Sequence, residues 1–295
     1  MLFAHFQPSD SSSLKFQQPR RSQILLLMFL VGLFHSEYVF GSSQDPAEKS
    51  SESQSVPAAD ENDEKAQKAA QLASEVSKKL KEIPDPRTLS RDDLPRVFKI
   101  IDQGLALGRQ YVSEYPAGND LPLVCCDLSR MLILNVDRHL GELNEEAKIF
   151  GEALTSEQRL SETFTYLSEV VNLANTALSQ EISSKLKCRA QTILGDCMLK
   201  LRESSRAADA FAGALKLDTS EIDLPELKIK HLEALGIAER FQEMLTFGNE
   251  YLTNDPRSPF LPHLIYFTHK AHRHLGALES GRQLWQTWGP VLKAG

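Results

Sequence analysis

Apolar residues recur along most of this chain at intervals of three and four, the spacing of one face of an α-helix. The first such segment covers residues 65–83 and ends before Pro84, which cannot continue a helix. The second opens at Ser90, and Asp93 three residues later completes a predicted N-terminal capping box. Both segments are therefore predicted to be amphipathic helices.

The same spacing predicts eight further helices joined by short connections. Thr155 and Gln158 form a second predicted capping box at the start of a long one. No alternating run bounded by turn residues indicates a β-strand, so consecutive antiparallel helices are expected and the predicted fold class is all-α. The eight ranges are 123–140, 155–178, 182–201, 205–217, 224–235, 238–253, 261–275 and 278–292.

Two adjacent predicted helices within residues 191–219 share a pattern of small and large apolar positions. Small residues are needed where two helix backbones approach closely, and larger ones fill the space to the next helix pair. The pattern resembles one unit of the tetratricopeptide repeat (TPR), most clearly over residues 188–219, with Gln191 in place of the family's Trp and Thr219 in place of its closing Pro. The matching positions are Leu194, Gly195, Met198, Ala207, Phe211 and Ala214.

Two weaker echoes of this unit lie at residues 105–118 and 241–259. Each looks like a second repeat helix that ends in an aromatic-containing turn and a Pro. The stretch 123–184 matches no repeat. The resemblance implies an α-solenoid of about five antiparallel helix pairs over residues 65–295, which acts as a non-catalytic protein–protein interaction scaffold.

The resemblance also implies which residues contact the partner. In this family the partner lies in a groove lined by variable residues of each first helix. The implied contacts are Arg189, Thr192, Asp196 and Lys200 in the clearest unit, with Glu226, Ile229 and Glu233 in the next. Their mixed charges suit a charged protein or peptide segment, whereas the alternative is that they are ordinary solvated positions.

The N-terminus has the order of residues expected of a targeting signal. Arg20 and Arg21 precede the apolar run 24–34, and small residues follow at Val39 and Gly41. This order is typical of a secretory signal peptide, and the run is short for a bilayer span. The chain is therefore expected to be exported, as a periplasmic or secreted protein.

Residues 1–41 are accordingly predicted to be a cleaved signal peptide, with an uncleaved membrane anchor as the alternative. Residues 42–64 are polar and without apolar periodicity, which predicts a disordered linker. The helical domain would follow over residues 65–295.

Charge narrows the range of partners. The chain has 33 Lys and Arg against 40 Asp and Glu, a formal net charge of −7, and no run of basic residues that would follow a phosphate backbone. Nucleic acid is therefore not an expected partner. Membrane contact is expected only through residues 1–41, if they are retained.

Cysteine spacing argues against a local disulfide. Cys125 and Cys126 are adjacent, and Cys188 and Cys197 are predicted on one helix, where nine residues rise roughly 13 Å. A bridge would therefore have to join the two groups across the fold. Burial as small apolar residues is the favoured interpretation for all four.

No motif indicates catalysis, a cofactor or a metal. His269 and His272 share a predicted helical face, but nothing completes a metal site, so a solvated polar face is favoured. Trp285 and Trp288 are interpreted as sealing one end of the helical stack, with an aromatic binding patch as the alternative. The alternative function is a helical enzyme that acts on envelope polysaccharide through paired carboxylates.

Overall fold

The computed structural model describes residues 59–84, 90–149 and 153–294, all of which belong to the unit that spans Pro57–Gly295. Its regular structure in these ranges consists of ten α-helices and one short 3-10 helix, without a strand. The predicted all-α class is therefore confirmed. The predicted signal peptide at 1–41 and residues 42–58 of the predicted linker lie outside the described residues. Within the described ranges, no helix is both long enough and apolar enough to cross a membrane.

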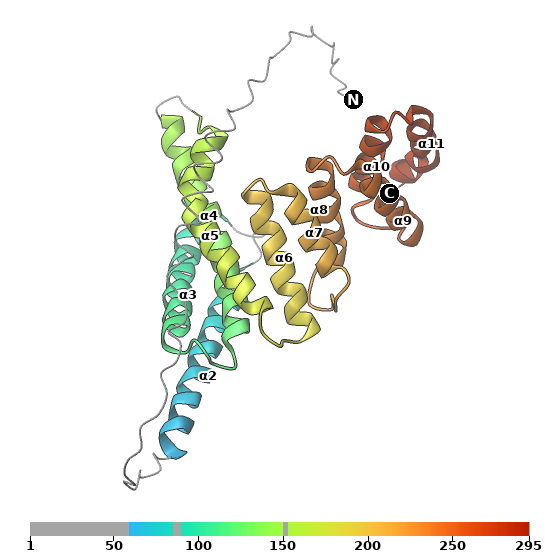
Figure 1. The fold of residues 1–295 in the computed structure, drawn as a ribbon. Coiled ribbons are helices and arrows are strands. Elements are labelled where there is room, and N and C mark those ends of the chain that lie inside the picture. The colour runs from blue at the N-terminus through green and yellow to red at the C-terminus, as the bar shows by residue number, and fades with distance from the viewer. Residues whose placement is uncertain (1–58, 85–89, 150–152, 295) are drawn as a thin grey trace, which may run out of the picture. The chain divides into compact units, whose positions relative to one another are not determined.

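Every predicted helix has a counterpart (Figure 1). The largest differences are at the start of α2 and at the end of α4. Helix α2 begins at Ala59, so the predicted disordered linker 42–64 is wrong for residues 59–64, where Ala and Glu favour a helix. Helix α4 extends past residue 140 through nine residues that include three Glu. The helices are α2 (Ala59–Lys81), α3 (Leu94–Glu114), α4 (Leu121–Ile149), α5 (Ser156–Leu178), α6 (Ser184–Lys200), α7 (Ser204–Ala214), α8 (Leu224–Ile237), α9 (Phe241–Asn254), α10 (Leu261–His274) and α11 (Leu278–Ala294).

Both predicted capping boxes are present. The backbone N–H of Gln158 donates to Thr155 Oγ1 at 3.2 Å, and Gln158 Oε1 accepts from the Thr155 N–H at 2.8 Å. The Ser90 N–H donates to Asp93 Oδ2 at 3.1 Å, at the start of the 3-10 helix Arg91–Asp93 that precedes α3. These bonds satisfy N–H groups that would otherwise lack an intrahelical acceptor.

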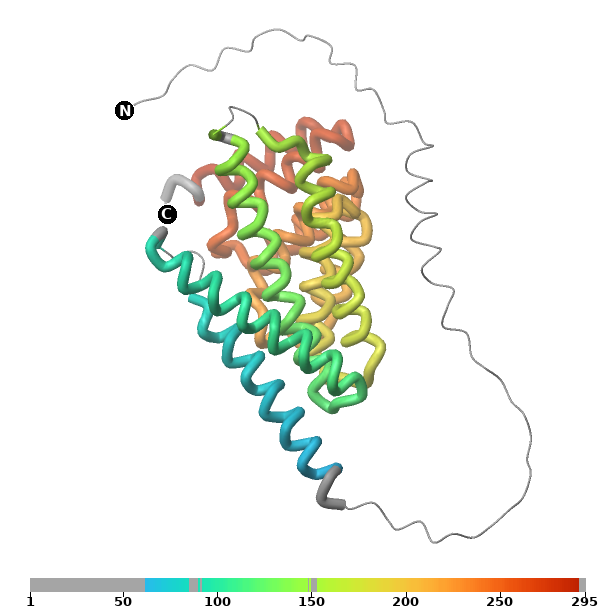
Figure 2. Tube along the Cα trace, turned by 90° about the vertical axis from the view of Figure 1, so that its left-hand side faces the viewer, coloured from blue at the N-terminus to red at the C-terminus, as the bar shows by residue number. Residues whose placement is uncertain are grey.

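Consecutive helices pack against one another from α2 to α11, and three pairs of alternate helices, α2 with α4, α4 with α6 and α8 with α10, also touch. Figure 2 shows α2 and α3 side by side, with α4 running next to α5. Each helix is therefore packed against the one before it and the one after it, and for description we take the helices two at a time. We call α2, α4, α6, α8 and α10 the first helices of these pairs.

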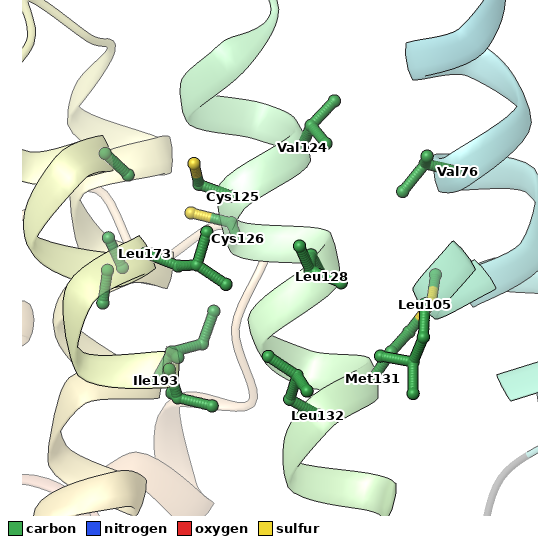
Figure 3. Close-up of a cluster of buried hydrophobic side chains, with 14 of the residues drawn as sticks. Val76, Leu105, Val124, Cys125, Cys126, Leu128, Met131, Leu132, Leu173 and Ile193 are labelled. Atoms are coloured by element: carbon green, nitrogen blue, oxygen red, sulfur yellow. The ribbon is translucent and has the colours of Figure 1, made fainter. Parts of the chain in front are cut away.

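Two apolar clusters form the core. The first joins α2 to α6 and the second joins α6 to α11, while Leu194 and Leu201 pack against both. In Figure 3, Cys125 and Cys126 of α4 project to the side of Leu173, and Val76 of α2 lies on the other side of α4. Val171 of α5 also packs against both clusters, so the two clusters meet at α5 and α6.

The four cysteines are buried free thiols, as the favoured interpretation predicts. Burial raises the pKa of Cys125 to about 11 and that of Cys126 and Cys197 to about 12. The thiols therefore stay protonated at neutral pH and act as small apolar side chains.

One turn geometry recurs in three helix pairs. A residue with left-handed backbone conformation links α6 to α7, α8 to α9 and α10 to α11, at a constant spacing of 37 residues: Arg202 (φ 63°), Glu239 (φ 59°) and Gly276 (φ 73°). In each turn the next residue's N–H donates to a carbonyl five residues back, which caps the first helix. These bonds are Glu203 N to Met198 O (2.8 Å), Arg240 N to Leu235 O (2.9 Å) and Ala277 N to His272 O (2.9 Å).

A second turn joins α3 to α4 and α9 to α10, the segments that the two sequence echoes cover. The N–H of Gly118 donates to the Tyr115 carbonyl at 3.0 Å, and at the same relative position the N–H of Ser258 donates to the Asp255 carbonyl at 3.2 Å. Each following helix begins with Leu-Pro, the proline taking a position where a helix needs no N–H donor. The two echoes therefore share one backbone turn.

Candidate functional site

Two adjoining cavities lie along the first helices of successive pairs. The smaller, of about 300 Å³, is lined by α4, α6, α8 and the segment before α8, and the larger, of about 890 Å³, adds the C-terminal end of α2. Because the two share lining residues, we treat them as one groove. The shared residues are Arg130, Leu134, Arg189, Glu221 and Glu226.

The structure brings four of the seven predicted contact residues together in the smaller cavity. They are Arg189, Thr192 and Asp196 of α6 and Glu226 of α8. The spacing of the three α6 residues, at three and then four, places them on one helical face.

The other three predicted contacts do not line the groove. Lys200 Nζ lies 2.5 Å from Asp137 Oδ1 of α4, in an exposed ion pair. Ile229 is half-buried and packs against the second apolar cluster. Glu233 is exposed on α8. All three lie on α6 or α8, but none of them belongs to the lining of the groove.

A buried ion pair ties three first helices together at the groove wall. Asp127 of α4 is 2% exposed, and its carboxylate accepts hydrogen bonds from the Arg189 guanidinium of α6 and, at 2.5 Å, from Ser77 Oγ of α2. The Arg189 side chain is only 16% exposed. The Arg189 guanidinium therefore serves mainly to bind Asp127 within the protein.

A second network occupies the smaller cavity. Lys230 Nζ of α8 lies 3.0 Å from Asp196 of α6 and 3.2 Å from Glu226, so two carboxylates share one ammonium. Burial raises the pKa of Asp196, and the charge of Lys230 opposes that shift. Burial also disfavours the charged lysine, but the two carboxylates hold the pKa of Lys230 above its usual value. The network thus places the Lys230 ammonium between two carboxylates inside the cavity.

The remaining charged residues of the groove divide by sign. Glu221 lies 3.8 Å from Lys185, and the Asp223 side chain accepts the Glu226 N–H at 3.1 Å, capping α8. Lys81 and Arg130, by contrast, are exposed and have no hydrogen-bond or ion-pair partner among the described residues. Within the described residues, the carboxylates of the groove therefore have partners inside the protein, whereas Lys81 and Arg130 do not.

Aliphatic side chains separate these charges. In the larger cavity they come from both sides: Leu80 and Ile83 at the end of α2, and Leu123 and Leu134 on α4. Half-buried aliphatic residues beside charges give a surface that can bind both parts of an amphipathic ligand.

Several groove residues were not predicted from the sequence. Asp127 has the clearest signal in the sequence, because it is a carboxylate within the largely apolar segment 121–136. A charge that is buried there needs a partner. Lys230 follows Glu226 at the helical spacing of four, which indicates a local pair but not its link to Asp196. Arg130 and the end of α2 had no comparable signal.

The solvated-face interpretation of His269 and His272 is wrong. His272 is buried, and His269 Nδ1 lies 3.3 Å from the Gly281 carbonyl of α11. Helix α11 packs on α10 over these residues, because Gly281 leaves room for the His269 ring. His263 and His274 are exposed. No group of three or more candidate ligands for a metal occurs in the described part of the chain.

The two tryptophans have different environments. Trp288 packs against the second apolar cluster, whereas Trp285 is 42% exposed and meets His269 edge-on, with ring centroids 6.0 Å apart. Trp288 thus contributes to the end of the core.

No protein-family model matches the chain, and no curated protein matches it either.

Proposed function

We propose that this protein is a non-catalytic interaction scaffold, an α-solenoid of TPR-like helix pairs that binds a segment of another protein in its groove. The observation that carries the proposal is the lining of the groove. Four successive first helices contribute to it, and they supply both aliphatic residues and charges. A surface of this kind suits an extended segment that contacts several helix pairs in turn.

The repeated turns support the solenoid part of the proposal. Arg202, Glu239 and Gly276 recur at one spacing with one hydrogen-bond pattern, which is expected when each pair is stacked on the previous one by the same rotation. Small residues at the closest helix contacts support it as well. A Cβ added at Gly108 would lie 2.9 Å from Leu128, and one added at Gly248 would lie 2.4 Å from Thr268.

The alternative of a polysaccharide-acting enzyme has less support. Paired-carboxylate catalysis needs one protonated acid and one free carboxylate beside the substrate. In the groove, Asp196 and Glu226 are both bound to the Lys230 ammonium, and Asp127 is buried under Arg189 and Ser77. These carboxylates serve the structure, so the binding function is preferred.

We also propose that the protein is exported, to the periplasm or outside the cell, and that residues 1–41 are removed. This rests on the order of Arg20 and Arg21, the apolar run and the small residues before Ser42. The binding partner would accordingly be another exported protein.

A selection experiment tests the groove. Ligands are selected from a random peptide display library with the immobilised full-length chain, and their affinities are then measured for Thr192→Trp. Thr192 lines the smaller cavity, and an indole there would fill much of its 300 Å³. The variant should lose most of its affinity for the selected peptides.

Thr246→Trp is the matched control. Thr246 is exposed on α9 and, like Thr192, bonds the carbonyl four residues before it. It should bind like the wild type. Peptides that bind Thr192→Trp and the wild type equally, or the absence of any selected peptide, would contradict the proposed binding site.

A further inference from the structure

The charges of the groove point to the chemistry of its partner. Each of its carboxylates already has a cation or an N–H group: Asp127 has Arg189, Asp196 and Glu226 share Lys230, Glu221 lies near Lys185, and Asp223 caps α8. A basic partner would have to compete with these internal bonds and would leave buried cations unpaired.

The situation of the cations is the opposite. Lys81 and Arg130 line the same 890 Å³ cavity, from α2 and α4, and neither has a partner among the described residues. Leu80, Ile83 and Leu134 lie in the same cavity. Among the described residues, this end of the groove therefore offers two positive charges without a partner beside an aliphatic surface, although the chain as a whole is acidic.

From this complementarity we infer that the larger cavity binds an acidic segment of a partner protein, one in which Asp or Glu residues alternate with aliphatic ones. The carboxylates pair with Lys81 and Arg130, and the aliphatic side chains cover Leu80, Ile83 and Leu134. The inference rests on the proposed groove function and specifies the partner for it. Such pairs speed association and select against basic segments more than they add affinity.

Three synthetic peptides test the inference. One alternates Glu with Leu and Val, the second has Gln in place of every Glu, and the third has Lys. Fluorescence anisotropy with the full-length chain should show the acidic peptide binding about ten-fold more tightly than the Gln peptide, with an affinity that falls as salt is added. The Lys peptide should bind more weakly than either.

Variants locate the effect. Lys81→Glu with Arg130→Glu should abolish the preference for the acidic peptide, whereas Arg130→Lys should keep most of it. Lys99→Glu is the matched control, because Lys99 is exposed on α3 and lines neither cavity. All substituted residues are exposed, so thermal melts should remain close to that of the wild type.

The outcomes separate the two proposals. If the Gln peptide binds as tightly as the acidic one and Thr192→Trp still blocks both, the acidic preference is wrong and the groove proposal stands. If no peptide responds to either kind of variant, both fail. The segment 42–58, which carries Asp45, Glu48 and Glu52, is the competing occupant. If the acidic peptide binds only after Asp45, Glu48 and Glu52 are changed to Gln, the occupant is the chain itself and a separate acidic partner is ruled out.

Discussion

Gly195 of α6 lies directly against the ring of Phe211 on α7, so closely that a Cβ added at Gly195 would be 2.4 Å from Phe211 Cε1. Non-bonded carbon atoms pack at about 3.5–4.0 Å, so the contact has no room for a methyl group. Phe211 is fully buried and cannot move aside without disturbing the second apolar cluster. The absence of a side chain at Gly195 therefore sets how closely the two helices approach.

The first prediction concerns this contact. Gly195→Ala should lower the free energy of unfolding by about 1–3 kcal/mol through overpacking, and Gly195→Leu by more. Gly141→Ala is the control, since Gly141 lies in α4 with nothing within 4 Å of an added Cβ. That change should stabilise the protein by about 0.5–1 kcal/mol. Chemical denaturation measures both, and equal effects of the same sign would contradict the packing.

The second prediction concerns the repeated turns. Glu239 has a left-handed conformation that costs a side-chain-bearing residue about 1–2 kcal/mol, while Gly276 adopts it without strain. Glu239→Gly should therefore raise the unfolding free energy by a few tenths to about 1 kcal/mol, and Gly276→Ala should lower it by about 1 kcal/mol.

Glu239→Ala is the control for the turn, because it removes the carboxylate and keeps the strained Cβ. It should give none of the gain seen with glycine in denaturant titrations. A gain as large as that of Glu239→Gly would show that the carboxylate, and not the backbone, is the source of the strain.

How much of this fold the sequence predicts depends on the range of the interaction. The helices were predictable because the period of three to four appears in consecutive residues. A close helix contact at Gly195 was expected because a small residue there lies between two adjacent predicted helices, and the structure places Phe211 against it. The 37-residue recurrence of the turn was not predictable from the sequence. Gly276 suggests a left-handed backbone, but Arg202 and Glu239 do not.

The groove was predictable only in part, because it depends on contacts between residues far apart in the sequence. Periodicity placed Arg189 and Asp196 on one face of α6, but it does not show which residues of α4 and α8 stand opposite. Asp127 is 62 positions from Arg189 in the chain, and their pairing depends on how the helix pairs stack. Lys200 is an example. Periodicity does not show that Asp137 of α4 lies opposite it, and the two form an ion pair outside the groove.

The third prediction concerns export. If residues 1–41 are a signal peptide, the mature chain should begin near Ser42, because Gly41 supplies the small residue that signal peptidase requires. Intact-mass measurement of the protein from the exported fraction gives the N-terminus directly. A membrane fraction that retains residues 1–41 would instead favour the uncleaved anchor.

The fourth prediction concerns the buried ion pair. Arg189→Met leaves the Asp127 carboxylate buried with only Ser77 as a donor, so it should lower the unfolding free energy by about 3 kcal/mol. Arg189→Glu should be worse, since it places two carboxylates together. Arg189 is for this reason unsuitable for testing binding by charge reversal, although its position in the groove first suggests that use.

Two further variants check that assignment. Asp127→Leu combined with Arg189→Met removes both charges and should recover much of the loss. Lys200→Glu disturbs the exposed pair with Asp137 and should change stability by no more than about 1 kcal/mol. A double variant as unstable as Arg189→Met alone would mean that packing, and not the unpaired carboxylate, causes the loss.

The fifth prediction is a loss of stability in mild acid that depends on His231. Its side chain is 7% exposed, meets Phe247 edge-on at 4.8 Å, and has no partner for Nδ1 among the described residues. Burial lowers the pKa of His231 from 6.5 to about 4. Because the folded state then binds this proton less readily than the unfolded state, its contribution to stability is complete above pH 6.5. It is lost as the pH falls from there to about 4. The loss should be on the order of 3 kcal/mol.

Two leucine variants isolate the contribution of His231 to this loss. His231→Leu should flatten the pH dependence of the unfolding free energy between pH 6.5 and 4, because the residue that must take up a proton on unfolding is gone. His263→Leu, at an exposed position, should leave that dependence unchanged. Denaturant titrations at a series of pH values measure both slopes. Equal slopes for the wild type and His231→Leu would show that His231 is protonated in the folded protein as easily as in the unfolded one.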